Sequence, residues 1–231
     1  MQEQHVPVIT IDGPSGTGKG TISLKLAHYL NWNYLDSGAL YRVLAFAAEK
    51  NDIAFDDVPA LVKLALELDL HFEINGDFQT KTYLDDRDIS KIIRSESCGQ
   101  NASKLASIQE VREALLERQR DFAKPPGLVT DGRDMGTVVF PNADLKLYLY
   151  ASAEERAFRR YKQLKEKEND VSLAQVVEEL QKRDERDKNR SHSPLKPADD
   201  AVLIDTTRLN IAQVFDNVLH LTIQRFKNRD E

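Results

Sequence analysis

Residues 6–21, VPVITIDGPSGTGKGT, decide the fold of this chain. The segment opens with a β-branched apolar run, Val6 to Ile11, which is typical of a strand buried in a parallel sheet. A glycine-rich loop follows after Asp12, and from Thr21 to Leu30 the apolar residues recur at helical spacing. The order of strand, glycine-rich loop and helix indicates an α/β fold.

Further apolar runs alternate with helical patterns along the chain. The expected strands are Tyr34-Leu35, Gly127 to Thr130, Leu145 to Tyr150 and Ala201 to Ile204. The expected helices are Gly38 to Lys50, Val58 to Leu68, Val111 to Phe122, Glu154 to Glu168, Leu173 to Arg190 and Ile211 to Phe226. This alternation predicts a parallel sheet covered by helices on both faces.

Two segments depart from that alternation. Residues 69–89 alternate polar and apolar residues around Asn75-Gly76-Asp77, which is a β-hairpin signature. A hairpin does not fit inside a doubly wound parallel sheet, so we expect a small antiparallel insertion at its rim. Residues 154–196 are dense in charges of both signs and predict exposed helices.

Composition limits the class of protein. The single cysteine, Cys98, rules out an intrachain disulfide, and the five histidines show no metal-ligand spacing. A net charge of −6 speaks against a surface that binds nucleic acid. With no apolar run of membrane-spanning length and no signal-peptide pattern, we expect a cytoplasmic protein, and we expect it to be a monomer.

The glycine-rich loop matches the pattern of phosphate-binding loops. Glycines let backbone N–H groups converge on phosphate oxygens, and the following helix directs its positive end to the same anion. The residues expected to bind ATP here are Gly13, Pro14, Ser15, Gly16, Thr17, Gly18, Lys19, Gly20 and Thr21. Gly20 separates Lys19 from the hydroxyl of Thr21, as in nucleoside monophosphate kinases. The alternative is a glycine-rich turn of chance composition.

A second anion site is predicted after the next strand. Ser37 and the free N–H groups near Gly38 open a helix, and Arg42 lies about one turn further on. A ligand belongs at this carboxyl end of a parallel sheet. The alternative is a capped helix start with a solvated arginine.

The run Asp131 to Thr137, DGRDMGT, follows another expected strand. Arg133 can clamp a phosphate through two hydrogen bonds, and Asp134 can accept from the amino group of a base. Asp131 is a candidate for holding Mg²⁺ through water, as is the hydroxyl of Thr21. The alternative is an Asp-Gly turn with local ion pairs.

The charged segment supplies a third cluster. Arg183, Asp187 and Arg190 share one helix face, and Arg156 and Arg160 share another, with Arg159 adjacent. Arginines that close over a transferred phosphoryl group stabilise its charge. The alternative is a solvated helix pair held by ion pairs.

Five motifs together resemble the bacterial cytidylate kinases, the (d)CMP kinases: VITIDGPSGTGKGT, YLDSGALYR, REALLERQR, TDGRDMGTVVFP and RDERDKNR. The resemblance runs from about Val8 to Thr206. It implies a three-layer core with a five-stranded parallel sheet (about 6–36, 124–153 and 197–231). It also implies a monophosphate-binding region with the β insertion (about 37–123) and a short lid (about 154–196).

The resemblance further implies transfer of a phosphoryl group from ATP to CMP or dCMP, with Mg²⁺. Ser103, Arg112 and Asp134 would read cytosine, and Tyr41 would join the CMP-binding set. The resemblance also implies that the acceptor phosphate is bound by Ser37, Arg42, Arg133 and Arg190. It implies that Asp187 and Arg183 contact the ribose, and that Arg159 and Arg160 contact the ATP phosphates. Lys19, Arg133, Arg160 and Arg190 would be the catalytic groups.

Other functions stay open on the sequence alone. A kinase for UMP, shikimate or another small acceptor would share the loop. A nucleotide-binding switch would lack a second anion cluster, which this chain has. An RNA-binding protein is disfavoured because no basic stripe is interleaved with aromatic residues.

Overall fold

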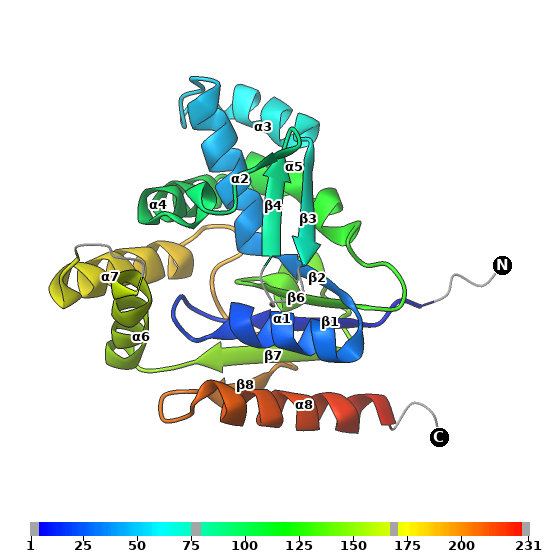
Figure 1. Ribbon diagram of the computed structural model, residues 1–231. Helices are drawn as coiled ribbons and strands as arrows, with labels where there is room; N and C mark the ends of the chain where they lie inside the picture. Colours follow the sequence, from blue (N-terminus) through cyan, green and yellow to red (C-terminus); the bar gives the residue numbers. More distant parts are fainter. Residues whose placement is uncertain (1–4, 75–79, 167–170, 228–231) are drawn as a thin grey trace. The chain divides into compact units, whose positions relative to one another are not determined.

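The computed structural model of the chain describes residues 5–74, 80–166 and 171–227 (Figure 1). These residues form two compact units. The first unit holds the described residues up to Leu35 and from Ala123 onward, and the second holds those from Asp36 to Phe122. Each unit contains a sheet and an apolar core. Within the described ranges, no helix has the length and apolar character needed to cross a membrane.

The first unit is built on a five-stranded parallel sheet. In order across the sheet, the strands are β2 (Asn33–Asp36), β6 (Leu128–Gly132), β1 (Val8–Asp12), β7 (Leu145–Tyr150) and β8 (Val202–Asp205). Strand β1 pairs in parallel with both β6 and β7, and β7 pairs in parallel with β8. All five predicted strands are confirmed: β7 has the predicted bounds, and the ends of the other four differ by one or two residues.

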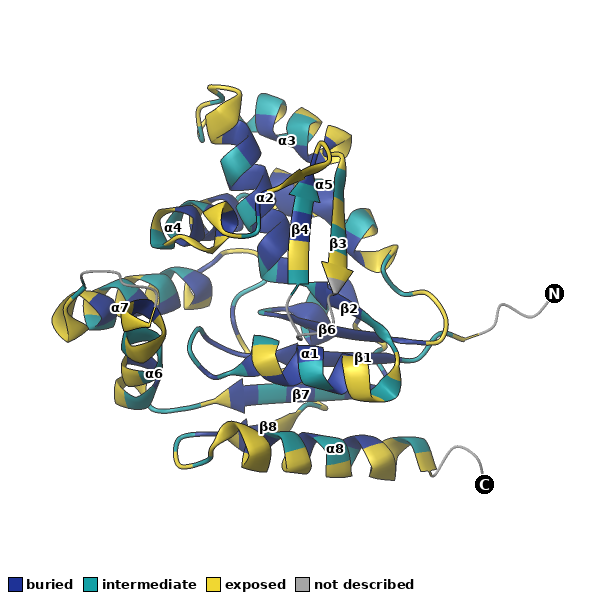
Figure 2. Cartoon of the chain, in the orientation of Figure 1, coloured by how far each residue is buried: buried dark blue, intermediate teal, exposed yellow. Residues whose placement is uncertain are grey.

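Four helices and one short turn complete this unit. They are α1 (Lys19–Leu30), α6 (Ala153–Lys165), α7 (Leu173–Lys188), α8 (Ile211–Lys227) and the π-helical turn η2 (Met135–Val139). Apolar residues of α1 and α8 form one buried cluster with β1 and β7. Figure 2 shows the buried strands β1 and β6 and the exposed side of α8. Helices α6 and α7 pack together around a smaller cluster of their own.

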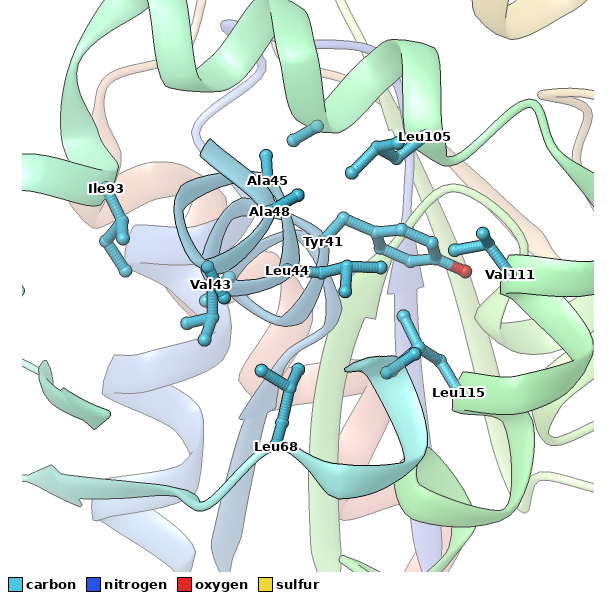
Figure 3. Packing of buried hydrophobic residues seen from close by; sticks show 14 of the residues in the cluster. Tyr41, Val43, Leu44, Ala45, Ala48, Leu68, Ile93, Leu105, Val111 and Leu115 are labelled. Atoms are coloured by element: carbon cyan, nitrogen blue, oxygen red, sulfur yellow. The ribbon is translucent and has the colours of Figure 1, made fainter. Parts of the chain in front are cut away.

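The second unit is mainly helical. Its helices are α2 (Ser37–Lys50), α3 (Val58–Glu67), α4 (Glu96–Leu105) and α5 (Gln109–Arg120), with a 3₁₀ turn η1 (Ile92–Arg94). Their apolar faces meet in a cluster in which the ring of Tyr41 lies among aliphatic side chains such as Leu105, Val111 and Leu115 (Figure 3).

The predicted antiparallel insertion is confirmed. Strand β3 (Leu70–Ile74) pairs antiparallel with β4 (Thr80–Leu84), which pairs with β5 (Arg87–Asp88). The predicted turn at Asn75-Gly76-Asp77 lies outside the described residues.

Helix α4 was not predicted. Its sequence, ESCGQNASKL, is rich in residues with low helix propensity. Its start is capped by Ser95, whose hydroxyl accepts from the N–H of Cys98 at 3.3 Å, and its buried side packs on α2. Tertiary packing therefore stabilises a helix that the local sequence pattern does not predict.

Candidate active site

The loop between β1 and α1 requires glycine for two different reasons. A Cβ atom on Gly13 would lie 2.1 Å from the carbonyl oxygen of Leu149, so the loop passes too close to β7 for any side chain. Gly18 has open space around it but adopts a φ of +87°, which L-residues disfavour. Gly13 itself has a φ of +149°, so glycine is required there by both close approach and backbone conformation, and at Gly18 by backbone conformation alone.

Lys19 is the first residue of α1. Its side chain is largely buried, and Nζ lies 3.3 Å from the carbonyl oxygen of Pro14, to which it donates a hydrogen bond. Gly18, the N-cap, has no side chain with which to cap the helix. The first N–H groups of α1 are therefore suited to binding an anion, and the ammonium group is held at the same loop.

A cavity of about 980 Å³ opens beside this loop within the first unit. One wall is formed by the loop residues Ser15 to Gly18 and by Thr21, and another by Arg159 and Arg160 of α6. The segment from Thr207 to Ala212, at the start of α8, and further residues of α6 such as Glu155 and Gln163 also line it. A cavity of this size with mixed polar and apolar walls is suited to a nucleotide.

Asp131 lies at the end of β6 and is buried. Its Oδ1 accepts a hydrogen bond from the hydroxyl of Tyr34 at 2.7 Å. A Cβ on Gly20 would lie 3.8 Å from both carboxylate oxygens. The carboxylate therefore lies beside the first turn of α1, which carries Thr21.

Asp187 of α7 holds two arginines. Its Oδ2 accepts from Nε of Arg133 at 2.8 Å, and its Oδ1 accepts from Arg190. Burial alone would raise the pKa of Asp187, but the charges of Arg133, Arg190 and Arg183 outweigh it and bring the pKa to about 2. Burial likewise opposes the charged form of Arg133, yet Asp187 keeps the pKa of that guanidinium above its ordinary value. The four residues form one electrostatic unit.

A second buried ion pair joins α6 to α7, and its arginine also reaches the phosphate-binding loop. Arg156 of α6 lies 2.6 Å from Oδ2 of Asp184 on α7, and it also donates to the carbonyl oxygen of Ser15 at 3.2 Å. The neighbouring Arg159, predicted to contact ATP, donates to the carbonyl oxygens of Thr206 and Leu209 and lines the cavity.

Arg160, also predicted to contact the ATP phosphates, lines the same cavity. Its Nη1 donates to Oε1 of Gln163 at 2.7 Å on the same helix. Arg159 therefore ties the cavity wall to the segment that precedes α8, and Arg160 bonds within α6.

In the second unit, Ser37 begins α2 as predicted. The N-cap Asp36 accepts from the N–H of Ala39 at 3.1 Å, and the Ser37 hydroxyl donates to Oε1 of Gln119 at 2.8 Å. Arg42 donates to the carbonyl oxygens of Ile93 and Ser95 at 2.6 and 3.1 Å. Both predicted anion-binding side chains are thus held in place by this unit's own structure.

Three more predicted residues lie in the second unit on three different helices. Tyr41 (α2), Ser103 (α4) and Arg112 (α5) are all buried. The guanidinium carbon of Arg112 lies 5.7 Å from the centre of the Tyr41 ring, and Nη1 donates to the carbonyl oxygen of Ala106 at 3.2 Å. The unit therefore collects polar groups suited to a planar, hydrogen-bonding ligand.

Comparison with known proteins decides the family. The sequence model described as "Cytidylate kinase" matches residues 9–224. The cytidylate kinase of Aeromonas hydrophila is 54% identical over 216 residues, which cover 94% of each chain. That of Nitrosococcus oceani is 55% identical over 94% of this chain and 96% of its own. That of Pseudomonas fluorescens is 55% identical over 92% of this chain and 93% of its own.

The chain belongs to the cytidylate kinase family. The family resemblance and the fold class inferred from the sequence motifs are confirmed. The structure adds residues that sequence reasoning did not single out. Asp184 pairs with Arg156, and Gln119 accepts a hydrogen bond from the hydroxyl of Ser37. Asp12 accepts one from the N–H of Met135 in the DGRDMGT segment. All three residues lie inside the quoted motifs, but the pattern alone does not show their partners.

Proposed function

We propose that the chain transfers the γ-phosphoryl group of ATP to CMP or dCMP, giving ADP and CDP or dCDP. The observation that carries the proposal is the family match over residues 9–224, which includes the phosphate-binding loop with its adjoining cavity.

On the donor side, the loop from Gly13 to Thr21 binds the ATP phosphates through its backbone N–H groups. Lys19 supplies a positive charge to the β- and γ-phosphate oxygens. The cavity beside the loop takes the rest of the nucleotide, with Arg159 shaping its wall and Arg160 reaching the phosphates.

On the acceptor side, each unit contributes its own set of side chains. In the second unit, Ser37 and Arg42 bind the CMP phosphate, while Tyr41, Ser103 and Arg112 bind the base. In the first unit, Arg133 and Arg190 bind phosphate and Asp134 accepts from the cytosine amino group. Asp187, with Arg183, contacts the ribose. Because Asp187 bonds to Arg133 and Arg190, we propose that it also positions them.

The chemistry needs no general base, because the acceptor phosphate oxygen is already a nucleophile. Catalysis is then positioning and charge neutralisation. Lys19, Arg133, Arg160 and Arg190 supply the positive charge that stabilises the transferred group.

Mg²⁺ fits the oxygen donors present. Among the described residues, no cluster of three or more His, Cys, Asp or Glu residues forms a metal cage. Mg²⁺ commonly needs only one or two carboxylates besides substrate phosphates. Thr21 and Asp131 would hold it, Asp131 through water. When bound, it neutralises charge on the β- and γ-phosphate oxygens.

The test follows the labelled phosphate from [γ-³²P]ATP. We expect label in CDP when CMP is present. Lys19→Ala should lower turnover by about a hundred- to a thousand-fold, while Lys63→Ala, an exposed lysine of α3, should not. Label released as inorganic phosphate instead of CDP, or normal turnover by Lys19→Ala, would contradict the proposal.

A further inference from the structure

The carboxylate of Asp12 has no role in the chemistry proposed above, yet it is buried at the carboxyl end of β1. Its two oxygens accept hydrogen bonds from consecutive backbone N–H groups. Met135 donates to Oδ1 at 2.9 Å and Gly136 donates to Oδ2 at 2.8 Å. Asp12 also directly precedes Gly13, the first glycine of the phosphate-binding loop. One residue therefore joins that loop to the DGRDMGT segment.

The segment held by Asp12 is closely packed at both of its glycines. A Cβ on Gly132 would lie 2.8 Å from Cγ of Met135, and a Cβ on Gly136 would lie 2.9 Å from the hydroxyl oxygen of Thr10 on β1. Between these two glycines lie Arg133 and Asp134, the residues proposed to bind the phosphate and base of CMP. Fixing the amides at 135 and 136 therefore fixes the backbone from which both side chains extend.

We infer that Asp12 is a positioning residue that holds Arg133 and Asp134 in the geometry that binds CMP, by anchoring the N–H groups of Met135 and Gly136. The inference rests on the proposed function. It predicts that Asp12 acts on the affinity for the acceptor rather than on that for ATP.

The chemistry of the contact requires a carboxylate. Two N–H donors need two acceptors, which an ionised carboxylate supplies, whereas an amide offers one acceptor and one NH₂ donor. Burial raises the pKa of Asp12 to about 6, and the two N–H bonds and Lys19 oppose that rise while Asp134 adds to it. Burying the charged carboxylate of Asp12 costs free energy. The anchoring of the DGRDMGT segment explains why a carboxylate is nevertheless found at this position.

The experiment compares Asp12→Asn with Asp144→Asn. Asp144 is equally buried, its Oδ2 accepts from the N–H of Val8 at 2.7 Å at the opposite end of β1, and its Oδ1 lies 2.9 Å from Nε2 of His5. The control therefore makes the same carboxylate-to-amide change at a buried acid that has two partners and lies away from the DGRDMGT segment. For each variant we would measure KM for CMP, KM for ATP, the CMP-to-UMP ratio of kcat/KM, and hydrogen exchange of residues 133–140.

For Asp12→Asn we expect KM for CMP to rise about ten- to a hundred-fold, KM for ATP to change much less, and exchange in 133–140 to speed up. Asp144→Asn should show none of these changes. Asp12→Glu keeps both acceptor oxygens and should show the same pattern more weakly; it carries the test if Asp12→Asn does not fold. Equal losses for both substrates, or an unchanged KM for CMP, would overturn the inference.

The same series separates this inference from the proposed function. If the unaltered protein does not phosphorylate CMP, the proposed function fails. If the unaltered protein is active on CMP and the Asp12 variants keep its KM for CMP, only the role of Asp12 fails.

Discussion

Nε of Arg133 donates a hydrogen bond of 2.8 Å to Oδ2 of Asp187, although the two residues lie 54 positions apart. Arg133 follows the end of β6 and Asp187 lies near the end of α7. The other oxygen of the same carboxylate holds Arg190. Two guanidinium groups proposed to bind one phosphate are thus oriented by a single buried acid, which reduces the ordering needed when the ligand binds.

Asp187→Asn should make stability less dependent on pH. The folded pKa of Asp187, about 2, lies below its ordinary value of 3.8, so the ionised group stabilises the fold above pH 3.8, and this contribution is lost as pH falls toward 2. The variant should lose about 2 to 4 kcal/mol of unfolding free energy at pH 7. Urea unfolding of both proteins at several pH values down to 3 would measure this.

The control for that prediction is Asp200→Asn. Asp200 pairs with Lys146 at 2.9 Å but is exposed, and exposed pairs contribute little. The difference between the Asp187 variant and the parent should shrink as pH falls below 4. A difference that stays constant with pH would contradict the electrostatic account.

Arg133→Lys should impair catalysis without unfolding the protein. Lysine keeps the charge but loses the planar fork that can bond to Asp187 and a phosphate together. We expect kcat/KM for CMP to fall about a hundred-fold or more, with a small change in KM for ATP. Arg120→Lys, at an exposed position of α5, is the matched control. If Arg133→Lys had the same kinetics as the parent protein, Arg133 would not be part of the CMP-binding site.

The two glycines at the ends of the phosphate-binding loop should respond differently to alanine. At Gly18 the new methyl group meets open space, and the cost is the left-handed backbone, about 1–2 kcal/mol. At Gly13 the methyl group would also collide with the backbone of Leu149, so the loop or β7 must shift. Thermal unfolding should therefore rank Gly13→Ala as the less stable variant; the reverse order would contradict the loop geometry.

Asp134→Ala should weaken selection of the base. The buried carboxylate is proposed to accept from the amino group of cytosine, which uracil lacks. The loss in kcat/KM should therefore be about ten-fold or more for CMP and much smaller for UMP. Steady-state kinetics with both acceptors would measure this. Equal losses for the two substrates would assign Asp134 a role other than reading the base.

The sequence predicted the strands well because strands buried in a parallel sheet are continuous apolar runs, such as Leu145 to Tyr150. For the segment 131–137 the sequence predicts only that it follows a strand. In the structure its first two residues end β6, and η2 begins at Met135. A turn that depends on a carboxylate more than a hundred residues away leaves no local pattern.

The sequence also does not predict which acid pairs with which arginine in the site. Asp184 and Asp187 lie one turn apart on α7, yet Asp184 pairs with Arg156 of α6 and Asp187 with Arg133 beside β6. Helical spacing shows which residues share a face, but several arginines are near each acid along the chain. Only the tertiary fold selects the partner.

The measurement that tests the central claim most directly is a coupled assay of ADP formation with CMP, dCMP, UMP and AMP as acceptors. We predict rapid ADP formation that requires CMP or dCMP, with kcat/KM for these at least about a hundred-fold above that for UMP and AMP. Equal turnover with UMP or AMP, or ADP formation at the same rate without any acceptor, would contradict the assignment.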